Sequence, residues 1–122
     1  MQRRGGTFLV PVQINGAITL SFIVDSGAAD VTIPADVVLT LMRTGTLSES
    51  DFTGSRNYRL ADGSVVPSET FRIKSLKVGE RLVENVMGSV GRVDGPLLLG
   101  QSFLSRFKSW SIDNARSALL LD

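Results

Sequence analysis

The residues of this chain that are best suited to chemistry are Asp25, Ser26 and Gly27, which follow an apolar stretch. Residues 20–24 are apolar except for Ser21, and such a run of β-favouring residues is typical of a buried strand. A carboxylate at the end of a buried strand costs free energy unless it is paired, hydrogen-bonded or used in a reaction. Taken alone, however, the three residues favour an ordinary turn, because Asp, Ser and Gly are common turn formers.

The composition limits the reactions that such a carboxylate could serve. The 122 residues include no histidine and no cysteine. A Ser-His-Asp triad, a Cys-His pair, a histidine-based zinc site and disulfides are therefore excluded. Hydrolysis by this chain would have to use carboxylates, lysine, or a hard metal ion bound by oxygen ligands.

Length and composition predict one folded domain that spans residues 1–122. The hydrophobic fraction of 43% and the charged fraction of 20% are typical of globular proteins. A net charge of +1 argues against nucleic acid or an anionic membrane as a partner. No apolar run approaches the ~18 residues that span a bilayer, and the N-terminus lacks the apolar core of a signal peptide. We expect a soluble domain of unknown compartment, and an upstream membrane anchor in a longer precursor stays open.

Three strands in the first third of the chain are expected to position the carboxylate. Residues 7–14 alternate in polarity and place four apolar side chains on one face: Phe8, Val10, Val12 and Ile14. Asn15 and Gly16 predict a hairpin turn of type I′, in which both central residues need positive φ. The chain then returns as a strand over residues 17–24, and residues 31–33 form a third short strand.

A helical insertion is predicted over residues 35–52. Pro34 ends the preceding strand and can open a helix. Four apolar residues follow at helical spacing: Val37, Val38, Leu41 and Met42. Gly45 suits the position after the helix, and Ser48 with Asp51 resembles the start of a further short helical turn.

The remainder of the chain predicts hairpins and closing strands. The expected strands are residues 56–60, 65–73, 76–78, 82–90, 97–99, 110–113 and 118–121. Residues 61–64 and 79–80 form the turns of two hairpins. Residues 97–99 end at Gly100, and residues 102–107 predict a short helix. Many short strands separated by turns indicate an all-β barrel or sandwich with one or two short helices.

The order of these motifs resembles that of the retropepsin-like aspartic proteases, and most closely that of their small, single-domain bacterial members. Three motifs carry the resemblance: Asp25-Ser26-Gly27-Ala28 after an apolar strand, a hairpin tip at Asp62-Gly63, and Leu98-Leu99-Gly100 before a helix. The similarity covers about residues 8–121. It implies a closed acid-protease-type β-barrel that is half of a two-fold dimer.

Under this resemblance, Asp25 is the catalytic residue of an aspartic endopeptidase that acts on peptides or proteins. This chemistry needs two carboxylates that share one proton, so that one activates water while the other protonates the carbonyl oxygen. Because the chain contains one Asp-Ser-Gly, the second carboxylate must come from a second copy in a homodimer. The resemblance implies no cofactor and no metal.

The same resemblance assigns supporting roles around Asp25. Ser26 would hydrogen-bond backbone across the dimer, Gly27 would let substrate backbone approach closely, and Ala28 would keep the pocket wall small. The residues implied to form the tip of a flap over bound peptide are Ala61, Asp62 and Gly63. The residues implied to buttress the catalytic loop are Leu98, Leu99 and Gly100.

Two positions depart from the pattern of many viral members. Those proteins carry an acidic residue directly after the first motif, where this chain has Ala29 followed by Asp30, and an arginine where this chain has Gln101. Whether these changes weaken substrate clamping or dimerisation stays open. They favour the alternative of a catalytically silent relative that binds peptides or serves as an assembly module, whereas the intact Asp25 motif favours the protease. A plain β-barrel without a site is disfavoured by the second motif, which ends in glycine.

Overall fold

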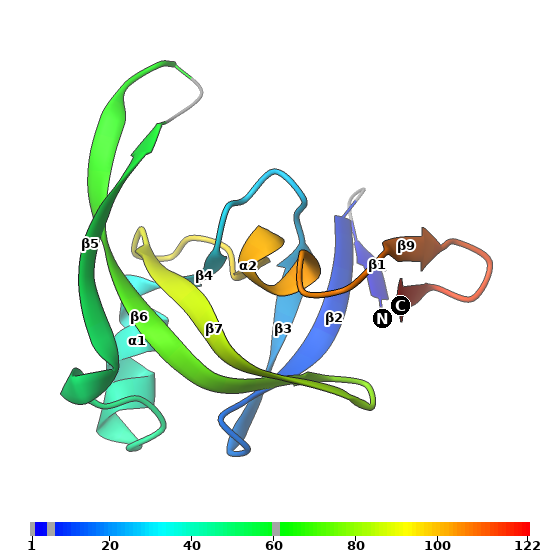
Figure 1. The fold of residues 1–122 in the computed structure, drawn as a ribbon, viewed down its shortest axis with the longest axis horizontal. Helices are drawn as coiled ribbons and strands as arrows, with labels where there is room; N and C mark the ends of the chain where they lie inside the picture. Colours follow the sequence, from blue (N-terminus) through cyan, green and yellow to red (C-terminus); the bar gives the residue numbers. More distant parts are fainter. Residues whose placement is uncertain (1, 5–6, 60–61) are drawn as a thin grey trace.

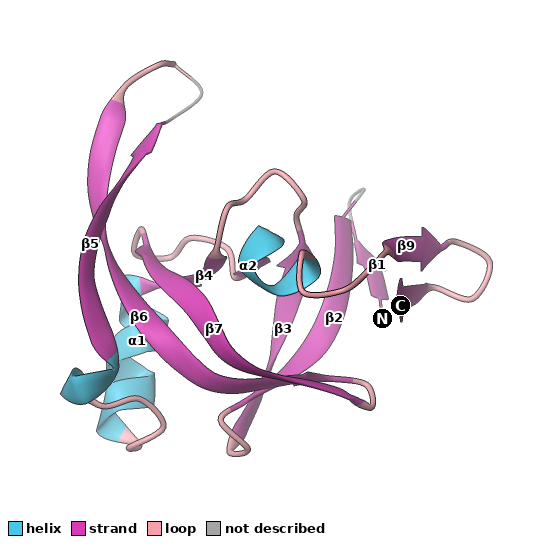
Figure 2. Ribbon diagram, viewed as in Figure 1, coloured by secondary structure: helices cyan, strands magenta, loops and turns pink. Residues whose placement is uncertain are grey.

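The computed structural model describes residues 2–4, 7–59 and 62–122, which form mainly strands with two short α-helices (Figures 1 and 2). The strands are β1 (Gln2–Arg4), β2 (Thr7–Ile14), β3 (Ile18–Val24), β4 (Val31–Pro34), β5 (Phe52–Arg59), β6 (Val65–Val78), β7 (Arg81–Gly91), β8 (Leu98–Leu99), β9 (Trp110–Asp113) and β10 (Ala118–Leu121). The helices are α1 (Ala35–Arg43), α2 (Gln101–Leu104) and a 3-10 turn, η1 (Glu49–Asp51).

The main sheet closes on itself. Its hydrogen-bonded strand order is β1-β2-β3-β8-β4-β7-β6-β5. A further antiparallel pairing joins β2 to β6, with Gln13 opposite Lys77 and Ile14 opposite Leu76. The six strands from β2 to β6 in this order therefore form a closed ring, as the sequence predicted. β1 and β5 extend the ring on either side, and β9 pairs with β10 in a separate two-stranded sheet.

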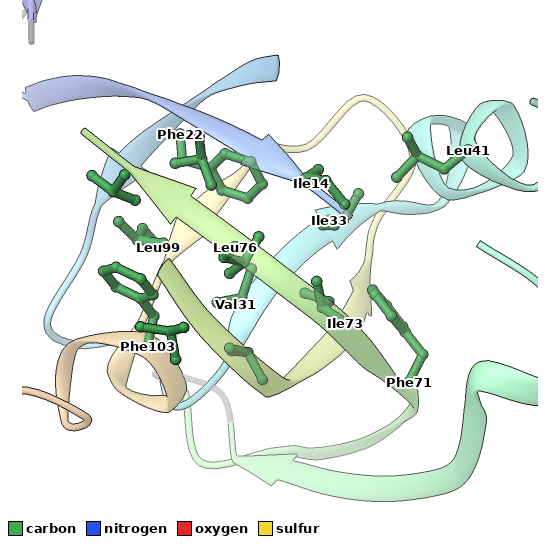
Figure 3. Close-up of a cluster of buried hydrophobic side chains, with 14 of the residues drawn as sticks. Ile14, Phe22, Val31, Ile33, Leu41, Phe71, Ile73, Leu76, Leu99 and Phe103 are labelled. Atoms are coloured by element: carbon green, nitrogen blue, oxygen red, sulfur yellow. The ribbon is translucent and has the colours of Figure 1, made fainter. Parts of the chain in front are cut away.

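The interior of the ring is filled by side chains from all around it (Figure 3). On β2, the expected alternation holds, since Val10, Val12 and Ile14 are buried. Phe22 of β3 and Phe103 of α2 are fully enclosed as well. Burying a side chain of this size stabilises the fold by about 1.5–3 kcal/mol. The core therefore gives the segments around Asp25 a rigid support.

The turns and the insertion follow the sequence signals. Asn15 and Gly16 have φ values of 52° and 67°, as a type I′ turn requires. Helix α1 ends at Arg43; Thr44 caps it, and Gly45 follows with a φ of 77°. At η1, the Ser48 backbone N–H and hydroxyl both donate to a carboxylate oxygen of Asp51, at 3.1 and 3.2 Å. None of the described helices is long and apolar enough to cross a bilayer.

Several predicted elements differ in extent. The strand expected at residues 56–60 is β5, which already begins at Phe52. The separate strands expected at residues 65–73 and 76–78 are one continuous strand, β6. It continues through Ser75, which lies opposite Glu84 in the ladder with β7. The Asn15 side chain also accepts the Ser75 N–H at 3.0 Å, while the Ser75 carbonyl accepts the Asn15 N–H at 2.9 Å. The predicted helix over residues 102–107 is shorter and begins earlier, at Gln101. After Leu104 the chain tightens, with Phe107 N–H donating to the Leu104 carbonyl three residues back.

Candidate active site

Asp25 lies directly after β3, at the start of a tight turn. Its carbonyl accepts the Ala28 N–H at 3.2 Å, and its side-chain Oδ1 accepts the Gly27 N–H at 2.9 Å. This second bond is an Asx turn, which fixes the carboxylate relative to its own backbone. In the single chain the Asp25 side chain is half-buried, so it is less enclosed than the strand that leads to it suggested. Ser26 and Gly27 are exposed.

The second motif runs beside the first. β3 and β8 pair in parallel, with Ile23 opposite Leu98 and Val24 opposite Leu99. The ladder continues to the backbone of Asp25, because the Asp25 N–H donates to the Leu99 carbonyl at 3.1 Å. Residues 98–100 therefore contact the loop of residues 25–30. We call residues 25–30 the Asp25 loop.

Gly100 lets the two segments approach closely. A Cβ atom at this position would lie 2.3 Å from the Asp30 carbonyl oxygen and 2.6 Å from that of Ala28. Its φ of −97° is one that any residue can adopt, so the glycine is required for space and not for backbone conformation.

The first residues of α2 hold the Asp25 loop through three hydrogen bonds. The Gln101 N–H donates to the Ala28 carbonyl at 2.8 Å, and the Ser102 N–H donates to the Ala29 carbonyl at 2.9 Å. The Gln101 side-chain amide donates to the Ser26 carbonyl at 2.9 Å. The residue that stands in place of an arginine thus braces the loop of its own chain by a neutral hydrogen bond.

Asp30 is the buried carboxylate of this loop, with 4% of its surface exposed. The Tyr58 hydroxyl donates to it, and the Arg56 guanidinium lies 3.4 Å from it. Burial, followed by the hydrogen bond to Asp30, raises the pKa of the Tyr58 hydroxyl, which therefore remains a donor well into the alkaline range. Both partners come from β5, so Asp30 joins the Asp25 loop to the β5–β6 hairpin.

Neither Arg56 nor Tyr58 was predicted from the sequence as a site residue. Asp30 drew attention as an acidic residue displaced by one position, but nothing local signals its partners, which are 26 and 28 residues away in sequence.

A cavity of about 820 Å³ opens beside the Asp25 loop. It is lined by residues 27–30 of that loop, by residues 56–59 of β5, and by parts of β6 and β7 with the residue that follows. We call it the loop cavity. Its volume falls in the range of ligand-binding clefts. A second cavity of equal volume lies near the C-terminal hairpin, lined by β10 together with residues 78–81 and Val10, and contains no residue of the Asp25 loop.

The expected flap residues lie elsewhere. Asp62 and Gly63 are exposed at the end of the β5–β6 hairpin, which projects from the ring in Figure 1, and Gly63 has a φ of 88°. The Ser64 hydroxyl and N–H donate to Asp62 at 2.6 and 2.9 Å, and these bonds lower the pKa of Asp62. Ala61 lies outside the described residues. The structure thus gathers the residues of the first and second motifs and leaves Asp62 and Gly63 at a distant tip.

Comparison with known proteins identifies the class. The family model described as "gag-polyprotein putative aspartyl protease" matches residues 10–106. The chain therefore belongs to the retropepsin-like aspartyl protease family, as the motifs predicted. Among solved structures, it is similar to a retropepsin-like aspartic protease from Rickettsia conorii, with a TM-score of 0.66 and 27% identity over 92% of this chain and 88% of that one. This likeness confirms the acid-protease-type fold. No curated protein sequence gave a significant match.

Proposed function

We propose that this chain is an aspartic endopeptidase whose dyad is formed by Asp25 from each of two subunits. The observation that carries the proposal is the Asp25 loop, in which the carboxylate is fixed by the Gly27 N–H and the loop is held by the second motif. Membership of an aspartyl protease family supports it. The loop cavity, which residues 27–30 of the Asp25 loop line, offers room for substrate side chains.

The reaction would use the two carboxylates in alternate protonation states. The ionised carboxylate takes a proton from water, and the resulting hydroxide attacks the carbonyl carbon of the peptide bond. The protonated carboxyl gives its proton to the carbonyl oxygen, forming a tetrahedral diol. When the diol collapses and the C–N bond breaks, the carboxyl that took the water proton gives it to the leaving nitrogen, and the other carboxylate takes a proton from a diol hydroxyl. The dyad then again holds one proton.

The dimer is required because one carboxylate cannot serve as acid and base at once. Two features of the single chain suit a partner. The Ser26 hydroxyl is exposed and has no hydrogen-bond partner among the described residues. On β10, Leu120 is 41% exposed, and an exposed apolar side chain on a short edge strand is a typical contact for a second chain. Asp62 and Gly63 would then close over bound peptide as the flap.

The deciding experiment replaces Asp25 with asparagine, which keeps its shape and removes its charge. Asp25→Asn should lower kcat/KM on a peptide mixture by at least about 10²–10⁴-fold, the usual contribution of general acid–base catalysis. Asp36→Asn is the matched control, because Asp36 is exposed on α1 and its oxygen can still accept the Asp94 N–H.

Mixing the two proteins tests the shared dyad. At constant wild-type concentration, added Asp25→Asn protein should inhibit cleavage by forming mixed dimers, whereas Asp36→Asn protein should add activity. Cleavage that persists in Asp25→Asn would contradict the assignment of Asp25. Peptide binding without cleavage by the wild type would instead identify the silent, peptide-binding relative.

A further inference from the structure

The loop cavity carries more positive than negative charge. Three arginines line it: Arg56 and Arg59 from β5, and Arg92 from the segment that follows β7. Among its described lining residues, Asp30 is the one acid. Counted with formal charges, three arginines against one aspartate give the lining a net charge of +2.

The single acid is already engaged. Asp30 is buried, accepts the Tyr58 hydroxyl, and lies 3.4 Å from the Arg56 guanidinium. A substrate cation could reach it only by displacing these partners, which would leave polar groups unsatisfied in a buried place. Asp30 is therefore poorly placed to select a basic substrate residue.

Unlike Arg56, the other two arginines of the cavity form no ion pair among the described residues. Arg59 and Arg92 are exposed, and neither lies within ion-pair distance of a carboxylate among the described residues. Isolated surface arginines are usually only solvated charges. These two differ because both line one concave cavity next to the Asp25 loop, where walls of low dielectric strengthen the field. A guanidinium also matches a carboxylate in shape, with two parallel N–H donors.

We infer that the loop cavity is a substrate subsite that selects glutamate or aspartate side chains through Arg59 and Arg92. The inference rests on the proposed peptidase function. Because each subunit of a two-fold dimer would present the same cavity, acidic residues would be favoured on both sides of the scissile bond.

The test uses one library of octapeptides in two parallel measurements. In the first, wild-type dimer cleaves the library and the cleavage sites are read by mass spectrometry. In the second, immobilised Asp25→Asn protein retains peptides, and the retained fraction is sequenced. The second measurement depends on binding alone, so it decides the acidic preference even if no peptide is cleaved and the proposed peptidase function fails.

Charge-removing variants identify the residues responsible. Arg59→Gln and Arg92→Gln should each lower kcat/KM, or binding, for a glutamate-containing peptide by about two- to fivefold, with no change for its glutamine counterpart, as expected for a partly exposed ion pair. The double variant should lose the preference. Arg43→Gln is the control, because Arg43 is exposed at the end of α1 and does not line the loop cavity.

The outcomes separate clearly. Enrichment of acidic residues that falls in the two single variants, persists in Arg43→Gln and weakens with added salt would support the inference. Equal cleavage and retention of glutamate and glutamine peptides would overturn it. So would an acidic preference that survives in the double variant.

Discussion

Replacing Gly100 with alanine should disrupt both the stability of the protein and the position of Asp25. The added Cβ would lie 2.3 Å from the Asp30 carbonyl oxygen and 2.6 Å from that of Ala28. Both neighbours are backbone atoms, so no side-chain rotation can relieve the contact. The Asp25 loop and the second motif must separate by about 1 Å to reach ordinary van der Waals distance.

The energetic cost follows from this separation. Overpacking in a tight interior costs about 1–3 kcal/mol. The bonds from the Gln101 and Ser102 N–H groups, now 2.8 and 2.9 Å long, would stretch beyond hydrogen-bonding distance. Each lost bond contributes about 0.5–1.5 kcal/mol. The total of about 2–6 kcal/mol is a large part of the free energy of unfolding of a small domain.

Two assays measure the effect against a matched control. Urea unfolding gives the stability change, and kcat/KM should fall about 10²-fold, because a 1 Å displacement of a catalytic group has an effect of that order. Gly79→Ala is the control, since its φ of 58° strains an alanine while the surrounding space is open. That variant should lose about 1–2 kcal/mol and keep its activity. If Gly100→Ala is no less stable than Gly79→Ala and equally active, the steric reasoning is wrong.

Three further predictions concern groups away from the second motif. Tyr58→Phe should lower the free energy of unfolding by about 1–3 kcal/mol in urea denaturation, because buried Asp30 loses a donor. Since the pKa of Tyr58 is raised above its ordinary 10.0, wild-type stability should also fall as the pH rises above 10, and Tyr58→Phe should lack this part of the decline. Amide exchange at residues 62–64 should be fast in the free protein and slow with a peptide-like inhibitor bound. The Asp113 carboxyl, whose pKa is lowered by hydrogen bonds from Arg116, should titrate below 3.8 by NMR; its stabilising contribution is present above that pH and is lost as the pH falls through the folded pKa.

Each of these predictions has a contrary result. Unchanged stability of Tyr58→Phe would show that Asp30 does not depend on the hydroxyl. Equal exchange rates at residues 62–64 in the free and inhibited protein would argue against a flap. An Arg116→Gln variant that leaves the Asp113 titration midpoint unchanged would remove the proposed cause of its low pKa.

Local patterns predicted those strands that show alternating polarity and are bounded by turn residues. The bounds of β2, β9 and β10 coincide with residues 7–14, 110–113 and 118–121, because alternation and turn residues mark both ends. β6 was divided wrongly. Ser75 pairs with Glu84 of β7 and also exchanges hydrogen bonds with Asn15, which is 60 residues away in sequence, and no local signal reports this second contact.

In the site, too, the residues with a local sequence signal were predictable and their distant partners were not. The Asp25 motif and the second motif can be recognised from their residue types and from their order along the chain. The structure places them side by side. The partners of Asp30 were not predictable, since burial of a carboxylate depends on which strand folds over it. The role of Gln101 was also hidden. As a sequence position it is only a missing arginine, whereas in the structure its amide supports the Ser26 carbonyl.

The contact between Asp30 and Tyr58 fixes the β5–β6 hairpin at one point, about which the tip of the hairpin could rotate. Tyr58 pairs with Val66 across the hairpin, and farther along β6 the Ser68 hydroxyl donates to the Val90 carbonyl at 2.6 Å. Gly63, at the tip of the hairpin, is three residues from Val66. The part of the hairpin between the Tyr58 contact and the tip is therefore roughly 10 Å long at the usual rise of a strand. A rotation of about 30° at Tyr58 would move the tip by roughly 5 Å on this estimate. Because Asp30 belongs to the Asp25 loop, a movement of the hairpin at Tyr58 would act on the same loop that contains the carboxylate of Asp25.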